Sequence, residues 1–244
     1  MCGLLGLFKE MLVQAAKGLR ELFFPRKCVV CGKMLEMEEK DLCEVCLAEL
    51  PLTYQWDIVQ NAAFERLARR FEVEDAAALM FFGAESDYRN VLYAIKYGGR
   101  RQLSRRMGVL LGGYLRGSRQ FGGCQAVVPV PLHPLRQWKR GYNQAEEIAR
   151  GVAEAMGLPL ETALLQRRRR TRSQTKLSGA AKTANVQDAF RVDADCARAL
   201  QTAGIRHLLL IDDTLTTGST LAACAAPLGA VGFRISCATV AFVG

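Results

Sequence analysis

Four of the nine cysteines stand in two C-x-x-C pairs, and this spacing constrains the fold more than any other feature of the chain. The pairs are Cys28 with Cys31 and Cys43 with Cys46, within the stretch CVVCGKMLEMEEKDLCEVC. Two residues between thiolates let one tight turn aim both sulfurs at one point, and two such turns complete a tetrahedron around Zn²⁺. Gly32, directly after the first pair, supplies the backbone freedom that such a turn needs. The spacing therefore predicts a small zinc module.

The role of this zinc follows from the number of ligands. Four protein thiolates close the coordination sphere, so no position remains for water or substrate. A thioredoxin-type redox site would carry one C-x-x-C pair on a strand-to-helix turn, not two pairs flanking a short polar stretch. The odd cysteine count also argues against a disulfide framework. We therefore predict that the zinc folds the module and takes no part in catalysis.

Residues 1–24 are apolar at positions close to helical spacing and are interrupted by Lys and Glu side chains. This pattern predicts an amphipathic helix, which docks on the protein's own domains or on a membrane surface or partner. No uninterrupted apolar run approaches the roughly 20 residues that span a bilayer, and no cleavage site follows a hydrophobic stretch. We expect a cytoplasmic protein without a transmembrane segment.

The rest of the chain alternates between apolar runs and amphipathic stretches. We predict strands at 76–83, 126–132, 208–211 and 235–243, and helices at 86–97 (capped by Ser86 or Asp87), 101–114, 143–157 and 219–226. Such alternation is typical of an α/β domain with a mostly parallel sheet and helices on both faces. The predicted domains are the helix at 1–24, the zinc module at 25–55 and the α/β domain at 70–244.

The stretch LLLIDDTLTTGST, residues 208–220, places two acids where a buried strand stops. Asp212 and Asp213 can accept hydrogen bonds from adjacent hydroxyls, at the strand end where parallel sheets bind ligands. Residues 214–220 then turn into a helix, whose free N–H groups favour a phosphate, and Gly218 permits close approach. The stretch matches neither a P-loop nor a dinucleotide fingerprint. It predicts a ribose 5-phosphate site; the alternative is a solvated loop after a core strand.

This stretch resembles the phosphoribosyl pyrophosphate signature of the type I phosphoribosyltransferases. VVPVPLHPLRQWKRGYNQAEEIA (127–149) resembles the loop and helix after the first strand of the ComF family, and RRRRTRSQTKLSGAAKTANVQDAF (167–190) resembles its hood loop. Together with the zinc module and AIKYGGRRQL (94–103), the resemblance to the ComF family runs from about Phe24 to the C-terminus.

The resemblance implies a phosphoribosyltransferase-like protein that binds phosphoribosyl pyrophosphate with Mg²⁺, which bridges the pyrophosphate and ribose oxygens. The implied ribose and phosphate contacts are Asp212, Asp213, Thr214, Thr216, Thr217, Gly218, Ser219 and Thr220, and the implied pyrophosphate contacts are Arg136, Arg140, Asn143 and Gln144. The acceptor is not indicated, and no catalytic residue is assigned. Lys96 and Arg100 are candidates for phosphate contact or for solvated cations at a helix end, and Trp138 for base stacking or for packing.

The segment after position 166 carries a run of positive charge. Its members are Arg167, Arg168, Arg169, Arg170, Arg172, Lys176 and Lys182, and the neutral Gln174 is a further candidate contact. Three interpretations stay open: a lid that closes over polyphosphate, a disordered basic arm, or a contact with a nucleic-acid backbone. The formal charge of +9 favours phosphate-bearing ligands in general.

The ComF resemblance also implies a role in DNA uptake, that is, in competence and natural transformation. Its implied partners are single-stranded DNA and a helicase or another competence protein. Three functions are therefore carried forward: a phosphoribosyl-transferring enzyme, a non-catalytic accessory protein whose phosphate site is a sensor or relic, and a regulatory binder of phosphoribosyl pyrophosphate.

Overall fold

The computed structural model describes residues 26–167 and 189–244. The predicted helix at 1–24 and basic residues 168–176 lie outside this range. The chain divides into two compact units, residues 1–50 and residues 51–244, which are described separately below.

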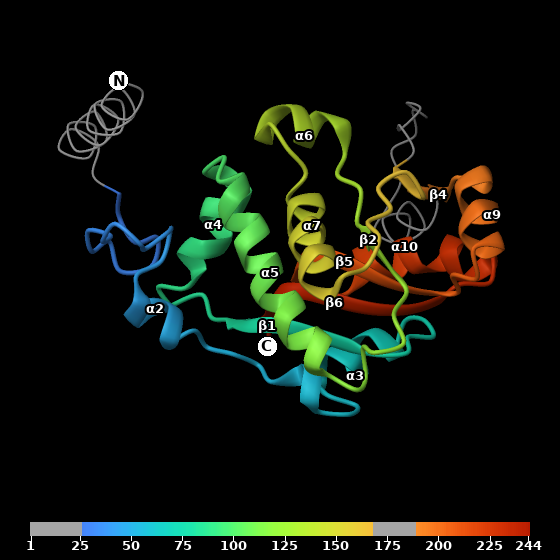
Figure 1. Ribbon diagram of the computed structural model, residues 1–244, viewed down its shortest axis with the longest axis horizontal. Helices are drawn as coiled ribbons and strands as arrows, with labels where there is room; N and C mark the ends of the chain where they lie inside the picture. Colours follow the sequence, from blue (N-terminus) through green and yellow to red (C-terminus); the bar gives the residue numbers. More distant parts are fainter. Residues whose placement is uncertain (1–25, 168–188) are drawn as a thin grey trace, which may run out of the picture. The chain divides into compact units, whose positions relative to one another are not determined.

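Short elements dominate the described part of the first unit, residues 26–50, and an α/β arrangement dominates the second unit (Figure 1). The first unit contains α2 (Glu44–Ala48). The second contains, in order, η1 (Gln55–Asp57), α3 (Ala62–Ala68), β1 (Ala76–Phe82), α4 (Arg89–Tyr97), α5 (Arg101–Gly117), β2 (Ala126–Pro129), α6 (Pro134–Arg140), α7 (Gln144–Met156), β3 (Leu165–Arg167), β4 (Phe190–Val192), α9 (Ala194–Thr202), β5 (His207–Leu215), α10 (Ser219–Ala230) and β6 (Arg234–Val243).

A four-stranded sheet in the order β1-β6-β5-β2 forms the centre of the second unit. All three neighbouring pairs are parallel, which confirms the predicted parallel sheet. Ile211 in the middle of β5 lies opposite Ala238 of β6 and Pro129 of β2. Because helices cover both faces, the strand residues are almost continuously buried instead of alternating with polar ones.

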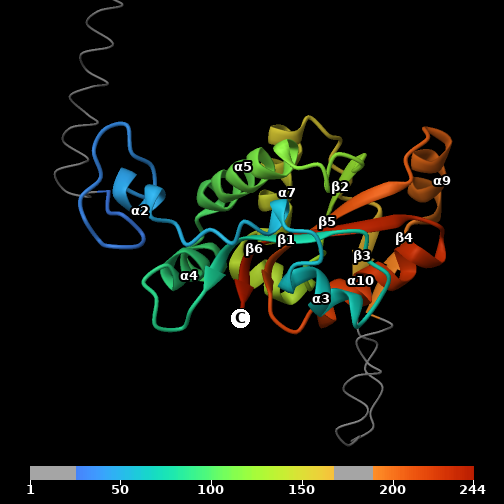
Figure 2. The same ribbon diagram turned by 90° about the horizontal axis from the view of Figure 1, so that it is seen from below.

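The two faces of the sheet are covered by different helices. Residues of α3 and α10 share a hydrophobic core with one set of strand positions, which includes Leu210 and Cys237. Helices α5 and α7 pack tightly on each other, and a Cβ at Gly108 or Gly151 would overlap the facing backbone. Seen from below, α5 and α3 lie on opposite sides of the sheet (Figure 2). The prediction of helices on both faces is confirmed.

Several predicted boundaries were wrong. The strand expected at 208–211 continues through both aspartates to Leu215, and the helix expected from Ser86 begins at Arg89. Neither Ser86 nor Asp87 is its cap, because Tyr88 occupies that position, and the Ser86 hydroxyl accepts a hydrogen bond from the amide of Tyr88 within a preceding turn. Helix α10 continues past Pro227, where the ring removes one backbone hydrogen bond close to the helix end.

Other elements were not predicted at all. They are α2, η1, α3, α6, α9 and the antiparallel pair of β3 and β4. Within the described residues, each helix is too short or too polar to cross a membrane.

Candidate functional site

The carboxylate pair lies near the end of β5, a central strand of the sheet. Asp212 and Asp213 are both half-buried, and Asp212 Oδ1 accepts a 2.8 Å hydrogen bond from the amide of Asp213. Burial raises the pKa of Asp212 well above its ordinary value, and the neighbouring charge of Asp213 raises it further. Ligand donors or cations placed here would relieve the cost of holding two acids together.

Lys96 brings a cation to this pair from α4. Its Nζ lies 3.4 Å from Asp213 Oδ1 and donates a 3.0 Å hydrogen bond to Thr214 Oγ1. The sequence offered Lys96 as a phosphate contact or a solvated helix-end cation, and in the structure it is bonded to Asp213 and Thr214 of β5. This contact joins α4 to the carboxylate pair, although the two lie 117 positions apart in the sequence. A phosphate contact by Lys96 stays a prediction.

The loop after β5 turns sharply into α10. Gly218 is the residue that caps this helix, at a φ of 75°, and a Cβ there would stand 2.6 Å from Leu67 Cδ2. The left-handed backbone therefore favours glycine, and a larger residue would also have to displace the methyl group of Leu67. Thr217 Oγ1 and Ser219 Oγ are 3.0 Å apart. The turn thus places hydroxyls beside the free amides of a twelve-residue helix, the usual arrangement for phosphate binding.

One small cavity, of about 20 Å³, brings together most of the residues predicted for the ribose and phosphate. Its lining comprises Asp212, Thr214, Leu215, Thr216, Thr217, Gly218, Ser219, Thr220 and Leu221. Asp213 is the one predicted member of this group that is not in the lining, and its carboxylate is instead bonded to Lys96.

The four predicted pyrophosphate contacts lie on or just after α6. Arg136 is exposed, whereas the Arg140 guanidinium lies 5.3 Å from the centre of the Tyr97 ring and donates to Gln144 Oε1. Asn143 is buried, caps α7 through the amide of Ala145, and donates to a backbone carbonyl of the preceding loop. These contacts stay predictions, since none of the four lines the cavity beside the aspartates.

Only one member of the basic segment falls within the described residues. The Arg167 guanidinium lies 5.1 Å from the centre of the Phe190 ring, at the end of the short β3–β4 sheet. Arg168, Arg169, Arg170, Arg172, Gln174 and Lys176 lie outside that part of the chain. The choice between lid, basic arm and nucleic-acid contact therefore stays a prediction.

Sequence reasoning missed the contribution of α3. The Arg66 guanidinium of this helix donates a 2.8 Å hydrogen bond to the carbonyl oxygen of Thr216, in the phosphate loop, and another to the carbonyl of Val243. The run FERLARR at 64–70, which carries three arginines, is the part of the sequence that could have indicated this helix. It spans too few turns for a helical pattern to be recognised within the mixed segment around it.

The sequence left Trp138 open between base stacking and packing, and the structure does not bury its side chain. Its side chain is 85% exposed on α6, with Leu135 of the same helix 71% exposed. A seven-residue helix with these side chains in solvent presents an apolar surface between cations.

The four cysteines of the first unit converge as their spacing predicts. Their sulfur atoms all lie within 4.8 Å of one another, and Sγ of Cys31 and Sγ of Cys43 are 3.8 Å apart. Gly32 has a φ of 74° in the first turn. The Cys43 amide donates to Cys28 Sγ at 3.4 Å, an interaction that favours a thiolate there. This donor set fits one tetrahedral Zn²⁺.

Comparison with known proteins supports the zinc module. A family model described as a double zinc ribbon domain matches residues 19–56, which include all four cysteines. Together with the convergent sulfur atoms, this match supports a structural zinc in the first unit.

The chain also has relatives among characterised bacterial proteins. It is 35% identical over 97 residues to Competence protein F of Haemophilus influenzae, covering 40% of this chain and 41% of that protein. It is 30% identical over 135 residues to DNA utilization protein YhgH of Salmonella typhimurium, covering 54% and 56%. For YhgH of Escherichia coli K12 the identity is 29% over 153 residues, covering 60% and 64%. The matches thus span about half the length of these relatives. The resemblance to the ComF family is confirmed, because the chain has homologues named Competence protein F and YhgH and carries a zinc ribbon match over its cysteine cluster.

Proposed function

We propose that the second unit binds phosphoribosyl pyrophosphate with Mg²⁺ and transfers its phosphoribosyl group to an acceptor. One observation carries the proposal: Asp212 and the hydroxyl-rich turn into α10 line a single cavity, at the carboxyl end of a central parallel strand. A carboxylate that accepts from ribose hydroxyls and a turn that holds a 5-phosphate are the two parts that a ribose phosphate requires.

The proposed roles follow from chemistry at the sugar. Displacing pyrophosphate from C1 leaves positive charge on the ribose and negative charge on the leaving group. The half-buried aspartates stand on the sugar side of this separation. The exposed Arg136 and the partly exposed Arg140 on α6 are the candidate cations for the pyrophosphate. Lys96 holds Asp213 in place from α4.

Mg²⁺ fits this site as an ion held mainly by the ligand. Within the described residues, the cysteine cluster is the one group of three or more Cys, His, Asp or Glu side chains close enough to share a metal. Mg²⁺ commonly keeps several waters and takes the rest of its ligands from substrate phosphates and one or two carboxylates, so Asp212 and Asp213 suffice. When bound, the ion would neutralise charge on the departing pyrophosphate.

The proposal predicts that Asp212→Asn combined with Asp213→Asn abolishes binding of phosphoribosyl pyrophosphate. Each lost hydrogen bond to a charged group is worth about 1.5–3 kcal/mol, so the dissociation constant should rise at least a hundredfold. The fold should persist, because the asparagine oxygen can still accept from the amide at position 213. Titration calorimetry with Mg²⁺ measures the affinity, and Asp195→Asn, which changes an exposed acid on α9, is the control. Equal affinity in the double variant would refute the proposal.

The names of the relatives support a second, compatible function. Competence protein F and DNA utilization protein YhgH are names that link those proteins to competence and to DNA. We infer that this chain acts in the same setting by binding single-stranded DNA. The specific observation is the exposed Trp138, which lies on α6 among Arg136 and Lys139. Aromatic rings between cations form stacking platforms for single strands.

Removal of that ring tests the second function. Trp138→Ala should weaken binding of a short oligothymidylate by about 1–3 kcal/mol, the value of one stacked base, and Trp138→Phe should restore most of the loss. Val59→Ala, which truncates another exposed apolar side chain, serves as the control. If Trp138→Ala binds the strand as tightly as the control, the platform has no role in DNA binding.

A further inference from the structure

A second cavity lies beside the phosphate loop, next to α3. Its volume is about 560 Å³, within the range of small-molecule sites, and Thr216 and Thr217 of the loop form part of its wall. Residues of α3 and its end form the rest: Ala62, Glu65, Arg66, Arg69 and Arg70. Because Thr216 and Thr217 line both cavities, the loop after β5 contributes to two sites.

Arg66 holds α3 against this loop. Its guanidinium bonds to the carbonyl oxygens of Thr216 and Val243, and it lies 4.2 Å from the centre of the Phe242 ring. These contacts use the side chain for structure and fix the wall of the cavity. A phosphate that enters would therefore meet a preformed surface.

Arg69 and Arg70 have no such partners. Both are exposed, and neither forms an ion pair or a side-chain hydrogen bond with any residue in the described ranges 26–167 and 189–244. The Arg70 Cδ lies about 3.5 Å from where a Cβ on Gly218 would stand, so the stem of this side chain passes along the phosphate loop. Two guanidinium groups that have no partner in the described part of the chain thus line the cavity.

The lining specifies the chemistry of the occupant. Three arginines and one glutamate give the cavity a net positive charge, Ala62 is its one apolar side chain, and the two threonines add hydroxyl donors. Guanidinium groups match phosphate oxygens in pairs of parallel hydrogen bonds. An apolar ligand would find little to contact here, whereas a phosphate would find several donors.

We propose that this arginine cavity (Ala62, Glu65, Arg66, Arg69, Arg70, Thr216 and Thr217) is a second phosphate-binding site, which shares Thr216 and Thr217 with the cavity at the ribose-phosphate turn. The phosphate can come from a free polyphosphate or from the phosphodiester of a nucleic-acid strand. The site goes beyond the proposed function, because it needs neither the aspartate pair nor Mg²⁺.

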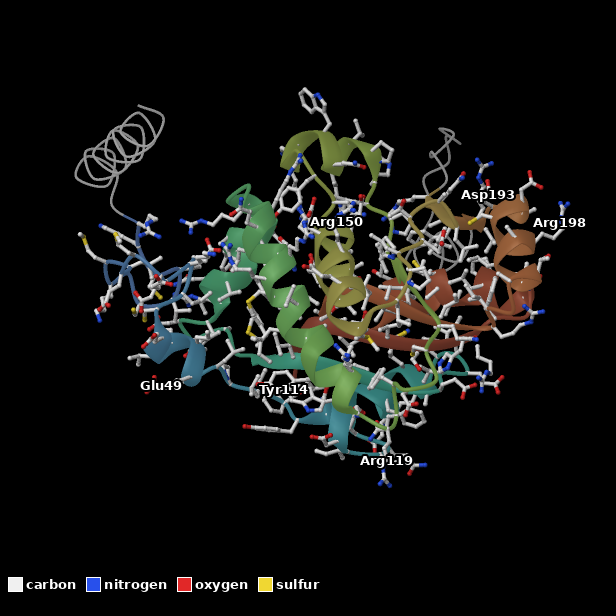
Figure 3. All side chains as sticks on the ribbon, in the orientation of Figure 1. Glu49, Tyr114, Arg119, Arg150, Asp193 and Arg198 are labelled. Atoms are coloured by element: carbon white, nitrogen blue, oxygen red, sulfur yellow. The ribbon has the colours of Figure 1, made fainter. Side chains whose placement is uncertain are left out.

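The test compares two double variants. The α3 variant combines Arg69→Gln and Arg70→Gln, and the control variant combines Arg116→Gln and Arg119→Gln. The control removes the same charge from exposed arginines in the last turn of α5 and just after it (Figure 3 labels Arg119). Helix α5 lies on the opposite face of the sheet from α3 (Figure 2). Three probes are titrated: inorganic tripolyphosphate, a ten-nucleotide oligothymidylate, and phosphoribosyl pyrophosphate with Mg²⁺. Melting temperatures check that both variants are folded.

The proposal expects the α3 variant to lose at least tenfold in affinity for tripolyphosphate, for the oligonucleotide or for both, relative to the control. Loss for the oligonucleotide alone identifies a nucleic-acid strand as the source of the phosphate. The slope of log affinity against log salt concentration should then be shallower by about 1.4, because two phosphate contacts are lost. Affinity for phosphoribosyl pyrophosphate should stay within twofold of the unmodified protein.

Two results would overturn the proposal. One is equal affinity of the α3 variant and its control for both tripolyphosphate and the oligonucleotide, which would leave the arginines as cations that stabilise a helix end. The other is an equal loss for phosphoribosyl pyrophosphate, which would make them part of the ribose-phosphate site. An unmodified protein that fails to bind phosphoribosyl pyrophosphate overturns the proposed function without affecting this one.

Discussion

At the scale of single residues, the site is defined by an acid whose ionisation is costly. Asp212 is held beside Asp213 at a half-buried strand end, so burial and a like charge both raise its pKa. An adjacent backbone amide and Lys96 lower it only in part. Functional sites often carry such groups, because the cost in the free protein is returned when a ligand arrives.

This cost predicts how stability depends on pH. A carboxyl whose pKa is raised on folding stabilises the native state below its unfolded pKa, and the contribution is lost as pH rises through the folded pKa. The unfolding free energy of the unmodified protein minus that of Asp212→Asn should therefore fall from pH 4 towards pH 8. The fall should be about 1.4 kcal/mol for each unit by which folding raises the pKa of Asp212.

Urea unfolding at several pH values, without ligand or added Mg²⁺, measures this difference. Other shifted groups such as Asp75 are present in both proteins, so their contributions cancel. A difference that is constant or rises with pH would show that folding does not raise the pKa of Asp212.

At the scale of elements, the long periodic segments were predictable and the short ones were not. The helix expected at 143–157 is α7, capped by Asn143 and ended by Gly157 in the left-handed conformation, because both signals are local. The seven-residue α3 and α6 give only two turns of periodicity, too few to distinguish from a loop. The arginines of α3 were missed for this reason.

The end of β5 shows a second limit of sequence reasoning. Asp212 to Thr214 carry turn-forming residue types, yet they continue the strand because β6 offers backbone partners as far as Phe242. Tertiary pairing decided what local preference could not. The predicted ribose-phosphate residues still gather around one cavity, since adjacent positions in a strand and turn stay together. Lys96 and Arg66 come from distant segments, so their contacts with this loop could not be read from the chain.

At the scale of the whole molecule, two units rely on different sources of stability. The second unit has a hydrophobic core on each face of its sheet. In the described part of the first unit, residues 26–50, three of the six buried hydrophobic positions are themselves zinc-cluster cysteines: Cys28, Cys43 and Cys46. Below roughly 40 residues a core seldom suffices without a metal or disulfides, so this unit should depend on zinc.

Removal of zinc should therefore unfold the first unit and leave the second intact. Binding of structural zinc contributes an apparent free energy of about 10–16 kcal/mol to the folding of zinc-finger peptides. The remaining core of residues 26–50 cannot replace a contribution of this size. A strong chelator should expose residues 26–50 to rapid hydrogen exchange, while the strands of the second unit stay protected and phosphoribosyl pyrophosphate still binds when Mg²⁺ is restored. Cys31→Ser should lower the zinc content below one ion per chain, whereas Cys196→Ser, outside the cluster, should not. Loss of protection throughout β5 and β6 on chelation would mean that the second unit cannot fold without the first.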